Sequence, residues 1–76
     1  MRNIYENVEL IRQNRGIPKK KLAENANISN MACTRMLSGQ SKMPADILRS
    51  FATTLFVDDY NIFFDDKLTD LVMQDK

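Results

Sequence analysis

The sequence predicts an all-α fold, a compact bundle of about five short helices with a possible short C-terminal helix after them. Residues 4–11 and 48–55 carry apolar side chains at the spacing of one helical face. The two glycines and two prolines fall between such segments, and no strand-like alternation extends beyond three or four residues. The 76 residues fit one domain, whose stability is expected to be modest because its surface is large relative to its volume.

Glycine and proline delimit the first two helices. The apolar spacing predicts a helix over about 3–14, and Gly16 follows where a left-handed cap ends a helix. Pro18 is tolerated at a helix start, so a second helix is expected over about 19–25. The buried face of this second helix carries Leu22, Ala23 and Ala26.

A short turn and a third helix come next. Asn27 tolerates a positive φ better than most residues. Ile28 is an apolar plug, and Ser29 is a favourable N-cap for a helix over about 30–37, which Gly39 ends. The residues expected to point inward are Cys33 and Met36, with Ala32 and Leu37 at the margins. The outer face then carries Asn30, Met31, Thr34 and Arg35.

Pro44 opens the fourth helix, which has the clearest amphipathic pattern in the chain: Leu48, Phe51, Ala52 and Leu55. Asp58 is the expected N-cap of a short fifth helix through about Phe64, with Ile62 and Phe63 in the core. Asp65 or Asp66 would cap a last amphipathic segment that contains Leu68, Leu71 and Val72.

Charge is distributed unevenly, although the net charge is only +1. Residues 1–57 contain nine Lys and Arg against four Asp and Glu, a net +5. Residues 58–76 contain two Lys against six Asp, a net −4. A basic body with an acidic end fits a surface that faces a polyanion, and the alternative is an ordinary solvated surface.

The composition argues against several classes of site. Histidine is absent and Cys33 is the single cysteine, so neither an internal disulfide nor a Ser-His-Asp or Cys-His catalytic set can form. A zinc site has too few ligands, and no cofactor is expected. Cys33 is interpreted as a small core residue. No apolar run approaches a membrane span, and the charged N-terminal segment is unlike a signal peptide. We therefore expect a reduced, cytoplasmic protein that is not an enzyme.

Five landmarks share the spacing of a known family: Leu22-Ala23, Ile28-Ser29, Gly39, the segment from Ala52 to Leu55, and Val57-Asp58. On these residues the stretch 3–64 resembles the Cro and phage-repressor helix-turn-helix family, also called the xenobiotic-response-element type. The motif itself covers 19–38. The resemblance implies a lambda-repressor-like DNA-binding domain over residues 1–64, followed by an acidic helix or tail over 65–76.

The sequence departs from the family pattern at several positions. The family usually has Gly at Asn27, Gln at Lys19 and Ile at Cys33. Its usual Ile-Glu-Asn-Gly ending of the third helix is Met-Leu-Ser-Gly over 36–39, and the glycine common after the fourth helix is Phe56. None of these changes breaks the logic of the fold. Leu37 and Phe56 are apolar where the family is polar or small, which indicates an interface.

The resemblance implies that the third helix lies in the major groove of operator DNA. The positions that match base contacts are Asn30, Met31, Thr34 and Arg35. The positions that match phosphate contacts are Lys19, Lys20, Gln40, Ser41 and Lys42. The expected function is that of a transcriptional regulator of the Cro or repressor type, bound as a homodimer to a two-fold site.

A second hypothesis keeps the fold and replaces the operator by a protein. Four aromatic residues fall within residues 56–64, and they either close the core or contact a partner. The candidate interface residues are Leu37, Phe56, Tyr60, Phe63 and Phe64. In this alternative the chain is a phage modulator or antirepressor that binds a repressor or another protein, and an antitoxin is a related possibility.

Overall fold

Five α-helices and one 3-10 helix account for most of residues 1–74, the part of the chain that the computed structural model describes. They are α1 (Ile4–Arg15), α2 (Lys19–Ala26), α3 (Asn30–Leu37), α4 (Ala45–Thr54), η1 (Tyr60–Phe64) and α5 (Asp66–Gln74). The predicted all-α class is confirmed, and the first three helices lie within one or two residues of their predicted bounds. None of the helices in this part of the chain is both long enough and apolar enough to cross a bilayer.

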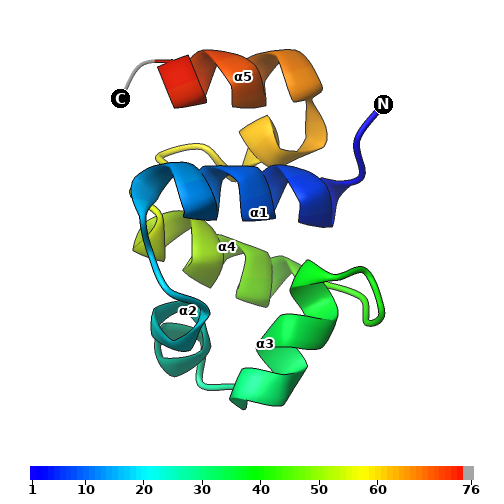
Figure 1. Cartoon of the computed structure of the whole chain (residues 1–76), viewed down its shortest axis with the longest axis vertical. Coiled ribbons are helices and arrows are strands. Elements are labelled where there is room, and N and C mark those ends of the chain that lie inside the picture. Colours follow the sequence, from blue (N-terminus) through cyan, green and yellow to red (C-terminus); the bar gives the residue numbers. More distant parts are fainter. Residues whose placement is uncertain (75–76) are drawn as a thin grey trace.

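The helices pack in two groups around α1 (Figure 1). On one side α1 contacts η1 and α5, and on the other side it contacts α3. The helices α2, α3 and α4 complete the second group, with α2 against both α3 and α4. Figure 1 shows α5 and α3 at opposite ends of the molecule. The faces of α3 and α5 that point away from the core are therefore separate surfaces.

The apolar faces predicted from helical spacing form one core. Its fully buried side chains include Val8, Ile11, Leu22, Cys33, Leu48, Phe51, Leu55 and Phe63. Cys33 points inward as predicted, whereas Met36 is only partly buried. Leu37, predicted at a surface interface, lies in this core instead, since it is 5% exposed. Phe63 was a candidate for both the core and an interface, and its full burial places it in the core.

Leu37 is buried because it lies one turn after Cys33 on α3. Residues four apart share a helix face, and this face of α3 meets α1. Phe63 is buried because η1 turns it toward α1, where its carbonyl oxygen accepts a hydrogen bond from buried Asn7. Its neighbour Phe64 is 63% exposed. The aromatic cluster is thus divided between core and surface.

The helices α1 to α4 all end in the same left-handed turn. The residue with positive φ is Gly16 (71°), Asn27 (59°), Gly39 (85°) or Phe56 (61°). After α4, Phe56 donates its backbone N–H to the carbonyl of Thr53 (3.2 Å), and Val57 donates to that of Ala52 (2.8 Å). This pairing satisfies carbonyls that the helix leaves free. A bulky side chain in this region costs about 1–2 kcal/mol, so Phe56 is the costly member of the four.

The N-terminal caps agree with the prediction at α3 and differ from it near η1. The Ser29 hydroxyl accepts a hydrogen bond from the Ala32 N–H at 3.0 Å. The predicted cap Asp58 is wrong, because Asp59 accepts from the Asn61 N–H (3.0 Å) and the segment is a 3-10 helix. Asp65 caps α5, since its carboxylate accepts from the N–H of Lys67 at 2.9 Å. Asp66 therefore does not cap the helix.

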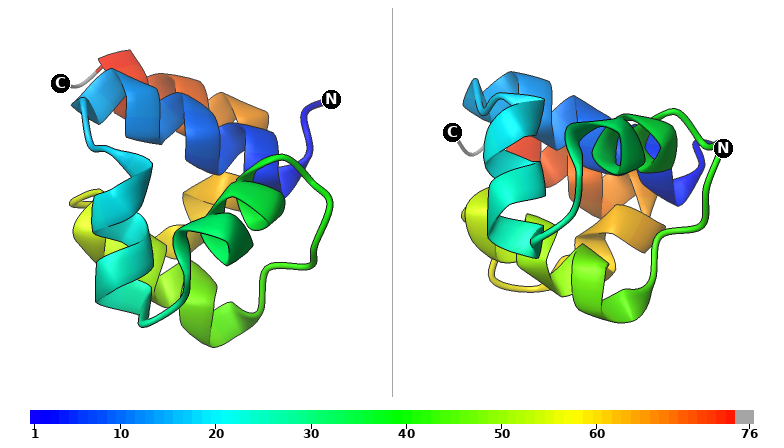
Figure 2. Two further views of the ribbon diagram at one scale, coloured as in Figure 1. Left: turned by 60° about the horizontal axis from the view of Figure 1, so that its bottom comes forward. Right: turned by 90° about the horizontal axis from the view of Figure 1, so that it is seen from below.

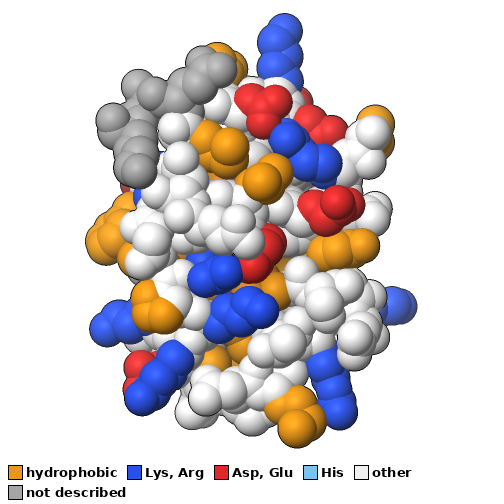
Figure 3. Space-filling model, viewed as in Figure 1, with side chains coloured by type: hydrophobic (Ala, Val, Ile, Leu, Met, Phe, Trp, Pro, Cys, Tyr) orange, Lys and Arg blue, Asp and Glu red, His pale blue; other side chains and the backbone are white. Residues whose placement is uncertain are grey.

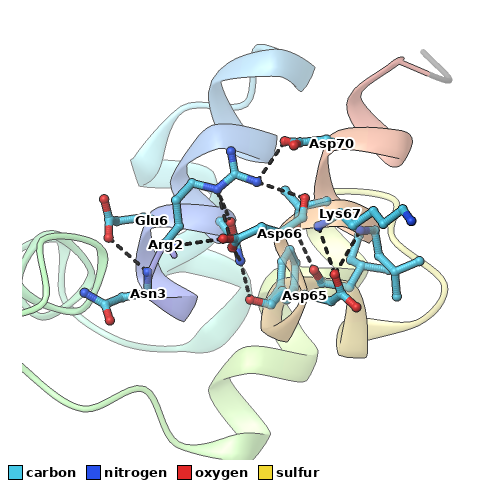
Figure 4. A network of polar contacts seen from close by, with 12 residues as sticks. Arg2, Asn3, Glu6, Asp65, Asp66, Lys67 and Asp70 are labelled. Atoms are coloured by element: carbon cyan, nitrogen blue, oxygen red, sulfur yellow. Dashed lines mark hydrogen bonds and ion pairs between the residues drawn. The ribbon is translucent and has the colours of Figure 1, made fainter.

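Polar contacts fasten α5 to the start of the chain (Figure 4). The Arg2 guanidinium contacts Asp70 at 2.8 Å and the Asn7 side-chain oxygen at 2.8 Å, and the Arg2 backbone N–H donates to Asp66 at 2.9 Å. Asn7, only 1% exposed, donates to Asp66 (3.1 Å) and to the carbonyl of Phe63 (2.8 Å). One buried amide thus joins the N-terminal segment, α1, η1 and α5.

Candidate nucleic-acid interface

A three-residue turn holds α2 and α3 at a fixed relative position. Ala23 is 1% exposed, and its small side chain lets the two helices approach closely. In the turn, Asn27 donates its N–H to Glu24 (3.2 Å) and Ile28 donates to the carbonyl of Ala23 (3.0 Å). The Cys33 thiol donates to the carbonyl of Lys19 at 3.6 Å, which ties the core of α3 to the first turn of α2. These contacts fix the orientation of α3 relative to α2, and with it the position of the outer face of α3.

The outer face of α3 carries the four residues predicted there. Asn30, Met31, Thr34 and Arg35 are all exposed, and Met31 is 64% exposed. Asn30 and Thr34 are one turn apart, as are Met31 and Arg35, so the four form one patch. Three of them offer hydrogen-bonding groups, and Met31 offers an apolar contact. We call these four residues the α3 patch.

The loop after α3 is attached to the backbone of Arg35. The Arg35 carbonyl accepts hydrogen bonds from the N–H groups of Gln40 (2.9 Å) and Ser41 (3.2 Å) and from the Ser38 hydroxyl (3.1 Å). Gln40, Ser41 and Lys42 are exposed. The loop therefore extends from the end of the α3 patch (Figure 2). Gln40, Ser41 and Lys42 are therefore tied by the backbone to the last residue of the α3 patch.

Tyr5 supports this loop from the side of α1, and the sequence analysis missed it. A Cβ atom placed on Gly39 would lie 2.6 Å from Cζ of Tyr5, so the ring and the glycine are in direct contact. Tyr5 and Gly39 also line a shallow hollow with Gln40, Ser41 and Lys42. The signal in the sequence was Gly39 itself, because a glycine permits such an approach as well as a positive φ.

The basic side chains of this region have no acidic partner within residues 1–74. Residues 19–42 contain Lys19, Lys20, Lys21, Arg35 and Lys42 against Glu24, a net +4. The ion pairs in the described chain involve Arg2 and Arg12 instead. Figure 3 shows most of the blue side chains over the middle and lower part of the molecule and most of the red ones in the upper half, where blue side chains also occur. Lys20 and Lys21 are exposed and Lys19 is half-buried, so these cations are available to an external anion.

Two ionisable groups packed near α2 and α3 have shifted pKa values. Burial raises the pKa of the Cys33 thiol, which keeps it neutral and unreactive. The pKa of Glu9 is lowered chiefly by hydrogen bonds from Arg12, at 2.6 Å from Nε. No group of three Cys, Asp or Glu side chains among the described residues is arranged to hold a metal ion.

The predicted protein-interface residues do not form one surface. Leu37 and Phe63 are in the core, whereas Phe56 is 76% exposed and Phe64 is 63% exposed. Tyr60 is half-buried, 5.8 Å beneath the Arg49 guanidinium, and it packs edge-on against Phe64 with ring centres 6.3 Å apart. The structure adds Leu68 and Leu71 on α5, 42% and 53% exposed, which the sequence analysis had placed on an amphipathic segment without assigning them to a surface.

Comparisons of the chain with known proteins identify no relative. No family model matches the sequence, and neither a curated protein nor a solved structure gives a significant match. A function for the chain must therefore be argued from its own residues.

Proposed function

We propose that this chain is a sequence-specific, DNA-binding regulator of transcription with a lambda-repressor-like fold, which reads operator DNA with α3. The observation that carries the proposal is the α3 patch, an exposed polar helix face beside lysines that lack acidic partners in residues 1–74. The major groove of DNA admits one α-helix, and phosphates on both sides of the groove attract such cations.

The residue types in the α3 patch suit the recognition of base edges. Arg35 fits the two acceptors of guanine, and Asn30 fits the donor and acceptor of adenine. Thr34 can bond to several bases, and Met31 supplies apolar contact for a thymine methyl group. In the proposal Lys19, Lys20, Gln40, Ser41 and Lys42 bind phosphates, which positions the protein without specifying sequence.

The test is selection from a pool of randomised DNA duplexes, followed by affinity measurements at several salt concentrations. Arg35→Ala should lose about 1–3 kcal/mol against the selected sequence and relax preference at one base position. Lys20→Ala should weaken binding to all sequences alike and reduce the salt slope by about 1. Lys67→Ala on α5, the matched control, should change neither property.

The proposal fails if no sequence is enriched, or if Arg35→Ala binds every duplex as the unaltered chain does. Equal losses for Arg35→Ala and Lys67→Ala would also contradict it, because binding would then follow total charge and not the α3 patch.

A protein-binding modulator or antirepressor is the second candidate, and the exposure of Met31 favours it. A flexible apolar side chain that is 64% exposed on the candidate reading helix suits an apolar partner surface. Met31→Lys separates the two functions. A cation here adds attraction for DNA and is expected to preserve non-specific affinity, whereas in an apolar protein interface it would abolish capture of the partner from host extract.

A further inference from the structure

The loop after α3 lies beside the start of α1 (Figure 2), and a hollow of about 450 Å³ separates them. Apolar side chains form one part of its lining: Ile4, Met36 and Met43. Hydrogen-bonding side chains form another part: Tyr5, Gln40, Ser41 and Lys42. The hollow adjoins the end of the α3 patch, because two of these loop residues donate their backbone N–H groups to the carbonyl of Arg35. Since phosphates flank the groove that a recognition helix enters, a duplex bound to α3 brings its backbone towards this hollow.

The Tyr5 hydroxyl has a proton to donate. Its oxygen accepts a hydrogen bond from the Asn3 side-chain amide at 3.2 Å. A phenol that accepts in this way keeps its own proton for a second partner, and within residues 1–74 no acceptor takes it. A Cβ atom placed on Gly39 would lie 2.9 Å from the hydroxyl oxygen, so the hydroxyl is on the loop side of the hollow. Contact of the ring with Gly39 therefore holds a hydrogen-bond donor at a defined position.

The charge around the hollow suits an anion. Lys42 is exposed and has no acidic partner within residues 1–74, and none of the described residues that line the hollow is acidic. The carboxylate of Glu6, next to Tyr5 in sequence, accepts from the Asn3 backbone N–H at 2.9 Å and lines a different hollow with Arg2. The hollow thus offers one ammonium group, two hydroxyls and one side-chain amide to an anionic ligand.

We infer that this hollow binds one phosphodiester unit of the DNA backbone, and that the Tyr5 hydroxyl donates a hydrogen bond to a phosphate oxygen. The apolar lining favours a diester over free phosphate, because the carbon atoms of the adjoining deoxyribose can pack against it and a bare ion cannot. The inference rests on the proposed function in that α3 brings a duplex to this surface. It requires no particular base sequence, since backbone contacts position the protein without specifying sequence.

Tyr5→Phe tests the hydroxyl alone, because the ring and its contact with Gly39 remain. With a duplex of fixed, arbitrary sequence at low salt, this variant should bind about three- to tenfold more weakly, the loss expected for one hydrogen bond. The dependence of affinity on salt should not change, because a neutral donor releases no counterion, whereas Lys42→Ala should reduce the salt slope by about 1. Tyr60→Phe on η1, which makes the same chemical change away from the hollow, should bind as the unaltered chain does.

Tyrosine ring signals in nuclear magnetic resonance spectra give a second measurement, since Tyr5 and Tyr60 are the only two tyrosines of the chain. Addition of the duplex should shift the ring signals of Tyr5 and leave those of Tyr60 in place. Inorganic phosphate at the same phosphate concentration should shift neither. An equal shift of Tyr5 with inorganic phosphate overturns the assignment of a diester.

The outcomes separate this inference from the reading of operator DNA. A chain that prefers one sequence but binds it equally well as Tyr5→Phe overturns the inference alone. The same holds if Tyr5→Ala loses affinity and Tyr5→Phe does not, because the ring then only supports the loop. A chain that binds all duplexes alike and loses affinity in Tyr5→Phe overturns sequence reading alone. Absence of binding to any duplex overturns both.

Discussion

Replacement of Asn7 by Ala tests how α5 is held to the rest of the fold. Asn7 is 1% exposed and makes three side-chain hydrogen bonds, to the Phe63 carbonyl, to Asp66 and from Arg2. The buried Phe63 carbonyl would lose this donor, which costs about 1–3 kcal/mol. Asp66 and Arg2 are partly solvated, and each lost bond to them adds about 0.5 kcal/mol, at the low end for a hydrogen bond. The total loss is about 2–4 kcal/mol.

A loss of this size is large for a chain of 76 residues, whose stability is of the order of 4–11 kcal/mol at typical values per residue. It should lower the melting temperature by at least about 8 °C, since 1 kcal/mol corresponds to about 4–8 °C at this size. Thermal and urea unfolding followed by circular dichroism measure the change. Asn61→Ala, an exposed amide on η1 that contributes only its backbone N–H, is the matched control.

If the free energies of unfolding of Asn7→Ala and Asn61→Ala differ by less than about 0.5 kcal/mol, the usual range for surface substitutions, the buried Asn7 amide does not hold α5 in place. Hydrogen exchange adds a spatial test. Amides of α5 should lose protection in Asn7→Ala before those of α2 and α4, because α2 and α4 pack in the other group of helices.

Three further predictions concern acid, Gly39 and the turn after α4. The pKa of Asp66 is lowered, chiefly because the Arg2 backbone N–H donates to it. Its contribution to stability is thus present above the ordinary value of 3.8 and lost as pH falls through the lower folded pKa, and Asp66→Asn should flatten this part of the pH–melting profile. Gly39→Ala should cost more than about 1 kcal/mol in urea unfolding, because φ is +85° and the new Cβ would lie 2.6 Å from the Tyr5 ring. An equally stable Gly39→Ala variant would show that the turn can relax. Finally, the free energy of unfolding of Phe56→Gly should be about 1 kcal/mol higher than that of Phe56→Ala, because both variants lose the ring and only glycine relieves the positive φ. A higher free energy of unfolding for Phe56→Ala would show that this turn is not strained.

Local rules explain why most helix boundaries could be predicted from the sequence. The turn at Asn27 and the cap at Ser29 depend on residues within a few positions of each other, and both occur as predicted. The exposure of the α3 patch follows in the same way from helical phase once Cys33 points inward. What these side chains bind is a property of a molecule outside the chain, so no helical pattern can supply it.

Long-range contacts explain most of what the sequence analysis missed. The burial of Leu37 depends on where α1 meets α3, and the contact of Tyr5 with Gly39 joins residues far apart in sequence. Arg2 and Asp66, separated by 64 positions, carry no pattern that links them. In η1, Phe63 and Phe64 are adjacent and chemically identical, yet one is buried and the other exposed. Only the tertiary arrangement decides between them.

Phe56 is an exception to the residue preference that the other left-handed helix ends follow. The rule that a left-handed helix end prefers glycine or asparagine holds at Gly16, Asn27 and Gly39, so its failure at Phe56 is not a general tolerance of this fold. The Phe56 ring is 76% exposed, so packing within the chain offsets little of the conformational cost, and glycine should give a higher free energy of unfolding than alanine at this position.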